Sequence, residues 1–471
     1  MELHISTKIL LPFFLCVLVV LFPLAFSQSS NDKFIQCLSQ NSDPVFTQNN
    51  TQFLSVLQST IVNLRFSAST TPKPLAIITP LTYAHVQSVV TCSKNFGYRV
   101  RIRSGGHDYA GLSYSSHDQV PFVVLDLQKL RSINIDSSKK TAWVESGATI
   151  GELYYWVSQN NKNLGFPAGI CPTLGVGGHL SGGGFGTLVR KYGLAADNVV
   201  DARIIDANGK ILDRKAMGED LFWAIRGGGG GSFGIVVAWK VNLVNVPDKV
   251  TVFSVSKTLE QGGSDLFNKW QSIGSKLSKD LFIRVIILPG STGGGDTSVL
   301  RDRKPEARRY FNAKSDYVKA PIPKERLQDI WNWMLEDDNP ILIMEPHGGR
   351  MDEIGETSTP YPHRKGYLYN IQYFQNWENS DASDKHISWM RRMYTNMTPY
   401  VSKNPRSTYV NYRDLDLGEN KNANNTSYSE AAMQWGSKYF GNNFRKLALV
   451  KGVVDPQNFF YFEQSIPPLK A

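Results

Sequence analysis

Three glycine-rich segments, at 103–111, 169–186 and 226–236, limit what this chain can fold into and bind more than any other feature of its sequence. Glycine lacks a Cβ and tolerates positive φ, so glycine-rich loops let backbone N–H groups crowd around a phosphate. One such loop would be an ordinary turn, but three in one stretch, two with unusual polar residues, indicate a site for a phosphate-bearing cofactor. None has the Gly-Lys-Ser/Thr of a P-loop, and none is placed as the dinucleotide-binding βαβ fingerprint requires.

The first 28 residues are predicted to be a secretory signal peptide. A weakly charged start leads into a nearly all-apolar run at 9–26, and the small residues Ala25 and Ser27 frame a cleavage site. The alternative is an uncleaved membrane anchor, because the run is almost long enough to span a bilayer. Pro12 and Pro23 favour cleavage, so we expect a secreted protein with no membrane attachment after cleavage.

The formal net charge of +10 suits an anionic environment such as an acidic polysaccharide matrix. Nucleic acid is the alternative partner, but the sequence has no Lys/Arg-rich run and no aromatic–basic motif, and secretion argues against it. N-glycosylation sequons at Asn49, Asn396, Asn424 and Asn425 fit secretion. We therefore expect no nucleic-acid partner, and no metal site is predicted.

Three cysteines remain once Cys16 leaves with the signal peptide, which is an odd number for a secreted protein. A disulfide between Cys37 and Cys92 would tie the N-terminal helical region to the following domain. In the chain-entropy model, closing that loop stabilises the fold by roughly 4 kcal/mol. Cys171 is then left over; the simplest interpretation is a buried thiol, but its place in the second glycine cluster argues against that.

A chain of 471 residues is too long for one ordinary core, so two lobes are expected. The first part, to about residue 246, contains apolar residues at helical spacing in some segments and short strand-like apolar runs in others, which predicts an α+β domain. Its expected elements are a helical region at 29–68, strands at 76–78, 100–103, 122–127 and 141–144, and a helix at 84–96. After Pro247 we expect strands at 252–256, 281–288 and 367–374 and helices at 325–335, 384–395 and 428–449.

The chain resembles the plant berberine bridge enzyme-like family, within the wider p-cresol methylhydroxylase/vanillyl alcohol oxidase flavoprotein group. The resemblance covers nearly the whole mature chain and rests on the glycine clusters and on three further motifs, at 345–351, 411–418 and 464–468. It implies an FAD domain split in sequence and a substrate domain with an antiparallel sheet and helices. The implied divisions are 1–28 signal peptide, 29–68 helical part, 69–246 FAD-binding domain, 247–415 substrate domain and 416–471 C-terminal return to the FAD domain.

The resemblance also implies that FAD is attached twice. In the family the histidine of the Arg-Ser-Gly-Gly-His motif joins the 8α methyl of the isoalloxazine, and the cysteine of the Gly-x-Cys-Pro-Thr motif joins C6; here these are His107 and Cys171. Thiolate and imidazole are nucleophiles able to add to an electron-poor flavin ring, and His179 is expected to be structural. The other candidate cofactor-binding residues are Arg103, Ser104, Gly105, Gly106, Gly111, Leu174, Gly177, Gly178, Gly182, Gly183, Phe185, Gly234, Ile235 and Val236.

Four residues are implied to line the substrate pocket: Tyr109, Asn370, Gln372 and Tyr412. Tyr412 lies where relatives use Tyr or His as a base, although a tyrosine pKa near 10 demands a neighbour that stabilises the tyrosinate, and the alternative is a packing residue. Asn370 departs from the family, whose members place Glu or Lys there, and can be neither a base nor a cation. Phe185 replaces a frequent Tyr.

Leu174 lies where the family controls oxygen access, and leucine there is associated with dehydrogenases rather than oxidases. The electron acceptor is therefore expected to be quinone-like, with O₂ as the alternative. Relatives carry several tens more residues between the strand at 281–288 and Asp302, where only 289–301 stand here. The substrate domain is thus expected to be shortened.

The leading hypothesis is an FAD-linked oxidoreductase that oxidises an alcohol or hemiacetal carbon of a small carbohydrate or phenolic by hydride transfer to flavin N5. The alternatives are oxidative ring closure in specialised metabolism and a flavin-binding protein without turnover. A monomer is expected, located in the cell wall or apoplast or in another secretory-pathway compartment such as the vacuole.

Overall fold

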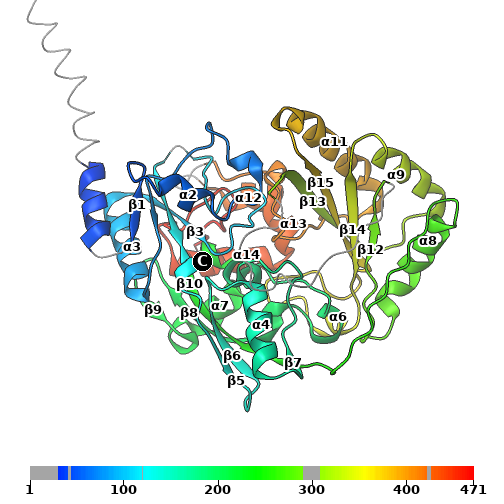
Figure 1. Ribbon diagram of the computed structural model, residues 1–471, viewed down its shortest axis with the longest axis horizontal. Helices are drawn as coiled ribbons and strands as arrows, with labels where there is room; N and C mark the ends of the chain where they lie inside the picture. Colours follow the sequence, from blue (N-terminus) through cyan, green and yellow to red (C-terminus); the bar gives the residue numbers. More distant parts are fainter. Residues whose placement is uncertain (1–29, 41–43, 119, 290–307, 422–425, 471) are drawn as a thin grey trace, which may run out of the picture.

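Two lobes lie side by side in the structure, and each is built on its own sheets (Figure 1). The structure, a computed structural model, describes residues 30–40, 44–118, 120–289, 308–421 and 426–470. The predicted signal peptide, the sequons at Asn424 and Asn425 and nearly all of 289–301 lie outside the described residues. No helix in the described ranges is long and apolar enough to cross a membrane.

The first lobe opens with a four-stranded sheet of order β1-β2-β4-β3. Its strands are β1 (Val45–Thr47), β2 (Ala76–Ile78), β4 (Phe122–Asp126) and β3 (Arg99–Arg103), and β4 pairs in parallel with both β2 and β3. Every residue of β2 and β4 is buried, as expected for parallel strands covered on both faces. Helix α3 (Tyr83–Phe96) makes the crossover from β2 to β3 and is capped by Thr82.

The N-terminal region is less helical than predicted. Residues 30–40 are helical and α2 covers Phe53–Gln58, but β1 lies between them and pairs antiparallel with β2. The β-branched and aromatic residues of β1 suit the open edge of β2, and that tertiary pairing overrides the helical spacing. The predicted Cys37–Cys92 disulfide is present and joins the helix at 30–40 to α3.

A second sheet of the first lobe is antiparallel, with the order β5-β6-β10-β8-β9. Its strands are β5 (Ile133–Asp136), β6 (Thr141–Glu145), β10 (Ile235–Asn242), β8 (Val199–Ile205) and β9 (Ile211–Leu212), and a separate pair joins β11 (Val244–Asn245) to β7 (Leu164–Gly165). The helices of this part are α4 (Ile150–Asn160), α5 (Val176–Ser181), α6 (Val189–Tyr192) and α7 (Arg214–Ile225). Side chains of α4, α5 and α7 share one hydrophobic cluster with those of β6, β8 and β10.

The second lobe is an antiparallel sheet of order β12-β14-β15-β13. Its strands are β12 (Val285–Ile287), β14 (Pro340–Pro346), β15 (Tyr369–Trp377) and β13 (Tyr310–Val318), and α10 (Arg350–Glu353) follows β14. Helices α8 (Gly263–Ile273), α9 (Leu327–Met334) and α11 (Ser383–Asn396) cover one face and form a core with alternate strand residues such as Tyr369 and Ile371. Asn370 and Gln372 therefore project from the other face, toward the first lobe.

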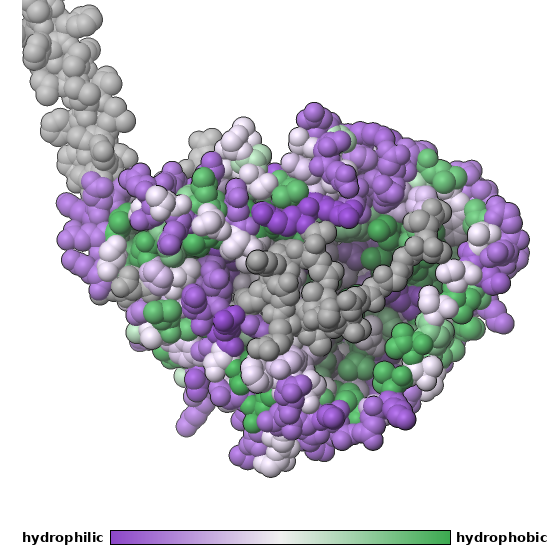
Figure 2. Space-filling model, in the orientation of Figure 1, coloured by the Kyte–Doolittle hydropathy of each residue, from purple (hydrophilic) through white to green (hydrophobic). Residues whose placement is uncertain are grey.

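The strand predicted at 252–256 is wrong, because residues 251–258 adopt no regular secondary structure. An alternating apolar segment forms a strand only where a neighbour offers its edge, and no described strand pairs with this one. Val250, Val252, Phe253 and Val255 are instead exposed. Figure 2 shows apolar surface along the lower right of the molecule, where this segment of the chain runs toward α8 in Figure 1. The strand predicted at 281–288 is likewise confined to β12.

The single helix predicted at 428–449 is also wrong. The structure has α12 (Tyr428–Ala431), a π-helical turn at Ala432–Gly436, α13 (Ser437–Phe440) and α14 (Asn443–Val454), with a break where Gly441 takes a φ of 53°. These helices pack in the hydrophobic cluster of the first lobe, and Glu463 pairs with Arg101 of β3 at 2.9 Å. The α+β class is confirmed, whereas the domain boundaries stay a prediction.

Candidate active site

The first two glycine clusters meet backbone to backbone. A Cβ added to Gly105 would lie 2.3 Å from the Gly175 nitrogen and 2.8 Å from the Thr173 oxygen. The Oγ of Ser104 donates to the Ser146 carbonyl at 2.5 Å, and the Nε2 of His107 lies 2.8 Å from the Thr173 Oγ1. Glycine is needed here because any side chain would force the two loops apart.

The third cluster wraps around the end of the second. The N–H groups of Gly227 and Gly229 both donate to the Ser181 carbonyl at 2.9 Å, and both glycines take positive φ. Gly234 fits against Ile204, whose side chain an added Cβ would meet at 2.7 Å. Beyond it, Ile235 and Val236 start β10 and are buried. All three glycine clusters are thus parts of one framework.

This framework fits a phosphate-bearing cofactor. Among the described residues, no hydrogen-bond acceptor faces any backbone N–H from Ser104 to Tyr109, although most backbone donors away from water find one. A Cβ added to the exposed Gly178 would meet nothing within 4 Å. Backbone N–H groups without a partner in the protein, on a loop next to an open glycine position, fit an anion such as a pyrophosphate.

Several of the predicted cofactor residues hold this cradle in shape. The guanidinium of Arg103 is buried and pairs with Asp126 at 2.6 Å, which fixes the end of β3 where the first glycine cluster begins. Gly106, Gly111 and Gly183 take positive φ, and an added Cβ would meet neighbouring atoms at Gly177 (3.0 Å) and at Gly182 (2.0 Å). Phe185 is buried and stacks on His347 with centroids 5.4 Å apart.

Two glycine-to-alanine variants should distinguish a glycine that the fold requires, Gly105, from one that borders open space, Gly178. Gly105→Ala should destabilise the protein by about 1–3 kcal/mol, because the backbone must shift to admit the methyl group. Gly178→Ala should leave unfolding unchanged but lower the flavin-to-protein absorbance ratio. Denaturant unfolding and absorption spectra measure both, and equal loss of stability in the two variants would contradict this assignment.

The two predicted attachment residues lie on the adjoining loops. Burial lowers the pKa of His107 to about 4, so its imidazole is neutral at pH 7 and keeps a nucleophilic lone pair. Thr173 engages Nε2, which leaves Nδ1 for a bond to a cofactor. Cys171 is exposed two residues before Thr173, and it contributes, after burial, to the raised pKa of Tyr109. The structure therefore brings the His107 and Cys171 loops together.

His179 has the structural role predicted for it. Its Nε2 accepts a hydrogen bond from the Gly169 N–H at 2.9 Å, and burial lowers its pKa to about 4, which keeps that nitrogen an acceptor. Leu174 follows Cys171 in the same loop and is partly buried against the core of the first lobe. Whether it controls oxygen access stays a prediction.

Three of the four predicted pocket residues touch one another across the lobes. The rings of Tyr109 and Tyr412 stack with centroids 5.6 Å apart and planes 3° from parallel. The side-chain amide of Gln372 donates to the Tyr109 hydroxyl at 2.7 Å. Asn370 lies two residues before Gln372 on β15, on the same face.

The electrostatics do not favour a charged Tyr412. Burial raises the pKa of its hydroxyl well above 10, and the nearby Glu345 carboxylate raises that pKa further. Arg284 opposes this effect only weakly, since it is itself ion-paired with Glu345. A base role for Tyr412 requires a neighbour that stabilises tyrosinate, and the strongest neighbouring charge does the reverse.

Sequence reasoning missed two functional candidates, Glu345 and Arg284. The first starts a motif that was noted only for its resemblance, and the second lies in a segment treated only as a strand. The sequence signal that could have identified both residues is a charged side chain in an otherwise apolar strand. Tyr409 was also missed: its hydroxyl accepts hydrogen bonds from the Gly184 and Phe185 N–H groups at 2.9 and 3.2 Å.

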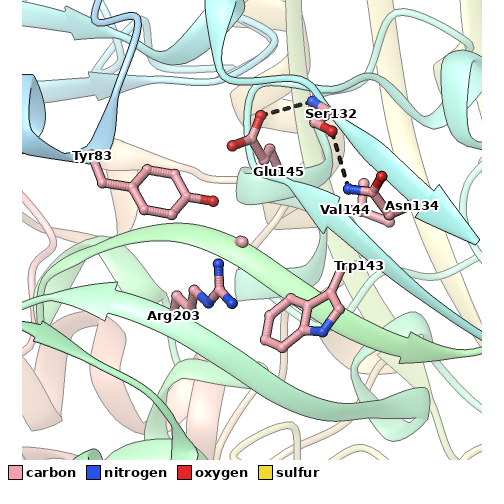
Figure 3. Close-up of a pocket in the computed structure, with 8 residues that line it drawn as sticks. Tyr83, Ser132, Asn134, Trp143, Val144, Glu145 and Arg203 are labelled. Carbon is pink, nitrogen blue, oxygen red and sulfur yellow. Dashed lines mark hydrogen bonds between the residues drawn. The ribbon is translucent and has the colours of Figure 1, made fainter.

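A separate hollow with a volume of about 220 Å³ lies where Tyr83 of α3 faces the second sheet. Trp143 and Glu145 of β6 and Arg203 of β8 line it (Figure 3), and Ala238 of β10 also contributes to its lining. The Arg203 guanidinium lies over the Trp143 ring, 4.7 Å from its centroid. None of the predicted site residues lines this hollow.

Comparisons with known proteins show the family to which the chain belongs. A family model described as an FAD binding domain matches residues 74–214, and one described as berberine and berberine like matches residues 408–467. Tetrahydroberberine oxidase of Berberis wilsoniae is 48% identical over 512 residues, covering 95% of this chain and 96% of that protein. Monolignol oxidoreductase AtBBE-like 13 of Arabidopsis thaliana is 45% identical over 513 residues, covering 94% and 95%.

Solved structures give the same result. Phl p 4, a grass pollen allergen with glucose dehydrogenase activity, has a TM-score of 0.90 at 43% identity and covers 93% of this chain and 100% of that chain. A berberine bridge enzyme variant that is a reticuline dehydrogenase has a TM-score of 0.87 at 38% identity, covering 93% and 99%.

The fold and the three glycine clusters thus define an FAD-linked oxidoreductase. More particularly, the chain belongs to the berberine bridge enzyme-like family. The 512 aligned positions with the Berberis protein exceed the 471 residues of this chain, so that relative has residues without a counterpart here.

Proposed function

We propose that this protein binds FAD through two covalent bonds, at His107 and Cys171, and oxidises an alcohol or hemiacetal carbon of a small carbohydrate or phenolic. The observation that carries the proposal is the meeting of the His107 and Cys171 loops beside the stacked pair of Tyr109 and Tyr412. The neutral His107 and the exposed Cys171 have the chemistry for both bonds. Bound FAD would supply the hydride acceptor, at N5 of its isoalloxazine.

The chain's own residues orient the substrate. The aromatic faces of Tyr109 and Tyr412 suit the apolar face of a sugar or the ring of a phenolic. The Gln372 amide donates to the Tyr109 hydroxyl oxygen. The proton of that hydroxyl can then be donated to a polar group of the substrate. Relatives named as a monolignol oxidoreductase and as having glucose dehydrogenase activity support this range of substrates.

A second candidate, oxidative ring closure of an alkaloid, is favoured by the similarity to tetrahydroberberine oxidase and to a reticuline dehydrogenase. A third, flavin binding without turnover, gains from Asn370 and from the residues that relatives carry and this chain lacks. An anaerobic screen of sugars, monolignols and alkaloids, followed by the bleaching of the flavin absorption, separates the three. We expect a sugar or a monolignol to bleach it; bleaching by alkaloids alone or by none would reject the proposal.

We propose further that the enzyme is a dehydrogenase with a quinone-like acceptor. Leu174 is larger than valine by one methylene and branches one carbon later. Its side chain would therefore crowd the path by which O₂ reaches the reduced flavin. Leu174→Val should therefore speed reoxidation of the reduced flavin by O₂, while reduction by substrate is unchanged. Stopped-flow mixing with air-saturated buffer measures the rate, and fast reoxidation of the wild type would contradict the dehydrogenase assignment.

Secretion and a monomeric state complete the proposal. The apolar N-terminal run and the net charge of +10 support export to the cell wall, the apoplast or the vacuole. The Cys37–Cys92 disulfide also suits an oxidising compartment.

A further inference from the structure

Two neighbouring strands of the second lobe direct a row of polar side chains at the pocket. On β14, Leu342 and Met344 pack under the helices, so Ile343 and Glu345 project from the opposite face. The register pairs Glu345 directly with Asn370 of β15. Paired residues on one face of an antiparallel sheet have Cβ atoms about 4.5–5.5 Å apart, so Glu345 and Asn370 act on the same part of the pocket.

Asn370 is built to receive a ligand. Its side chain is 1% exposed, yet neither Nδ2 nor Oδ1 has a hydrogen-bond partner among the described residues. Leaving a buried polar group unsatisfied costs about 1–3 kcal/mol. The Nδ2 group of an amide can donate to the oxygen of a substrate hydroxyl, which leaves the proton of that hydroxyl for a neighbouring acceptor.

Glu345 is a buried carboxylate held in place by one cation. It is 5% exposed and forms an ion pair with Arg284, which directly precedes β12. Within the described part of the chain, the Glu345 charge also contributes to the raised pKa of three nearby hydroxyls, those of Tyr109, Tyr409 and Tyr412. Burial raises the pKa of Glu345 itself above the ordinary glutamate value, against the pull of Arg284, which makes it a stronger base.

Carboxylate and phenol differ as proton acceptors in this pocket. Tyr412 must first ionise, and both burial and the Glu345 charge oppose that step. The ion pair with Arg284 stabilises the carboxylate form of Glu345, so this acceptor does not depend on ionising a buried phenol. The pairing with Asn370 also puts it beside the group that would hold a hydroxyl.

We propose that Glu345 is the proton acceptor of the reaction, with Asn370 binding the hydroxyl that is oxidised and Arg284 holding the carboxylate. In the step, the carbinol C–H bond would break and its hydrogen would leave with both electrons as hydride, for which bound FAD would supply the acceptor. The O–H bond breaks at the same carbon, its proton goes to the Glu345 carboxylate, and the C–O bond becomes a carbonyl. This inference rests on the proposed oxidation of an alcohol.

Anaerobic flavin reduction in two holoenzyme variants tests the assignment. Glu345→Gln keeps the size of the side chain and removes the base, so the reduction rate should fall by about 10²–10⁴-fold and lose its rise with pH. Tyr412→Phe should keep that rise and lose less than about tenfold. Glu356→Gln, an exposed site, is the matched control and should match wild type. The reverse pattern for Glu345 and Tyr412 overturns the proposal.

A second readout needs no turnover. A flavin bound in this pocket would report the protonation of Glu345 through its absorption, so the resting wild type should show a spectral titration that is absent in Glu345→Gln and present in Tyr412→Phe. Arg284→Met should move that titration to higher pH, since the carboxylate loses its cation, and Arg284→Lys should restore it. If no alcohol reduces the wild type, the proposed function fails while this titration still decides the role of Glu345. An identical titration in Glu345→Gln refutes it.

Discussion

Protein denatured in acid is expected to keep its yellow colour and to give no free flavin on filtration. Two covalent bonds, at His107 and Cys171, would hold the cofactor when all non-covalent contacts are lost. The His107→Ala and Cys171→Ala double variant should release all of its flavin, and each single variant should retain it through the remaining bond. Absorbance of the filtrate and of the precipitate measures the division.

Peptide mapping makes the same test residue by residue. A proteolytic digest should contain one flavin-bearing species in which the peptides of His107 and Cys171 are joined through the isoalloxazine. A filtrate that carries all the flavin of the wild-type protein would reject covalent attachment. Retention by the double variant would place the bonds on other residues.

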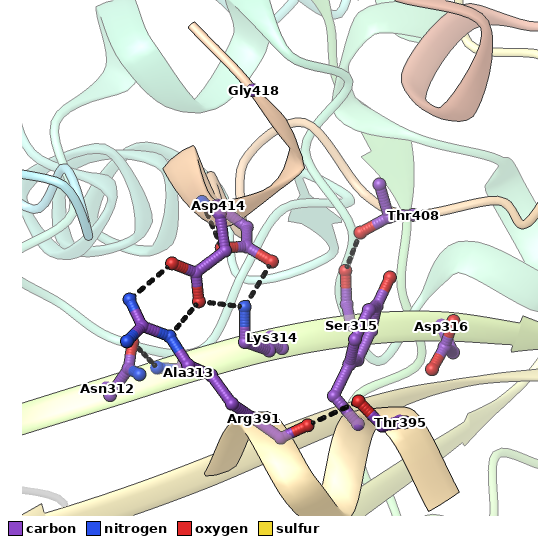
Figure 4. A network of polar contacts seen from close by, with 12 residues as sticks. Asn312, Ala313, Lys314, Ser315, Asp316, Arg391, Thr395, Thr408, Asp414 and Gly418 are labelled. Carbon is purple, nitrogen blue, oxygen red and sulfur yellow. Dashed lines mark hydrogen bonds and ion pairs between the residues drawn. The ribbon is translucent and has the colours of Figure 1, made fainter. Parts of the chain in front are cut away.

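Loss of Lys314 is expected to destabilise the protein by about 3–5 kcal/mol, the usual cost of removing one partner from a buried ion pair. Lys314 is 2% exposed and its Nζ donates to Asp414 and Asp416 at 2.7 Å each, while Arg391 closes the network on Asp416 (Figure 4). Lys314→Met would leave Asp414 buried without a cation. Because Asp414 follows Tyr412 by two residues, the position of Tyr412 should also loosen.

The chain offers a matched control in Lys385, which also contacts two aspartates, Asp337 and Asp338, but with a side chain that is 57% exposed. Solvent screens such a pair, and Lys385→Met should change stability by less than about 1 kcal/mol. Denaturant unfolding of both holoenzyme variants gives the comparison. Equal losses in the two would show that burial does not set the strength of the Lys314 network.

The strands and helices that the sequence predicted well are those whose apolar pattern matches the face or faces that they bury. The runs at 76–78 and 122–127 became β2 and β4, where every residue is buried, and the helix at 384–395 became α11. Alternation on β15 also placed Asn370 and Gln372 on one face. In these elements local pattern and tertiary environment agree.

In the other segments, a residue or strand distant in the sequence determines the structure. Local sequence does not show which distant segment will lie alongside. The segment at 45–47 is a strand because the edge of β2 is open, and 252–256 is not one because no described strand pairs with it. Glu345 joined the candidate site only through its register with Asn370 and its ion pair with Arg284, 61 residues earlier in the chain. Sequence motifs were enough to locate the cofactor loops. The grouping of Glu345, Asn370 and Arg284 could be identified only from the structure.

The central claim, oxidation of an alcohol carbon by hydride transfer, is tested most directly with a substrate carrying deuterium at that carbon. We predict that anaerobic flavin reduction slows severalfold with the labelled compound, that one carbonyl product forms per flavin reduced, and that each carbonyl formed has lost one deuterium atom from that carbon. Bleaching without an isotope effect, or a ring-closed product without a new carbonyl, would contradict the account.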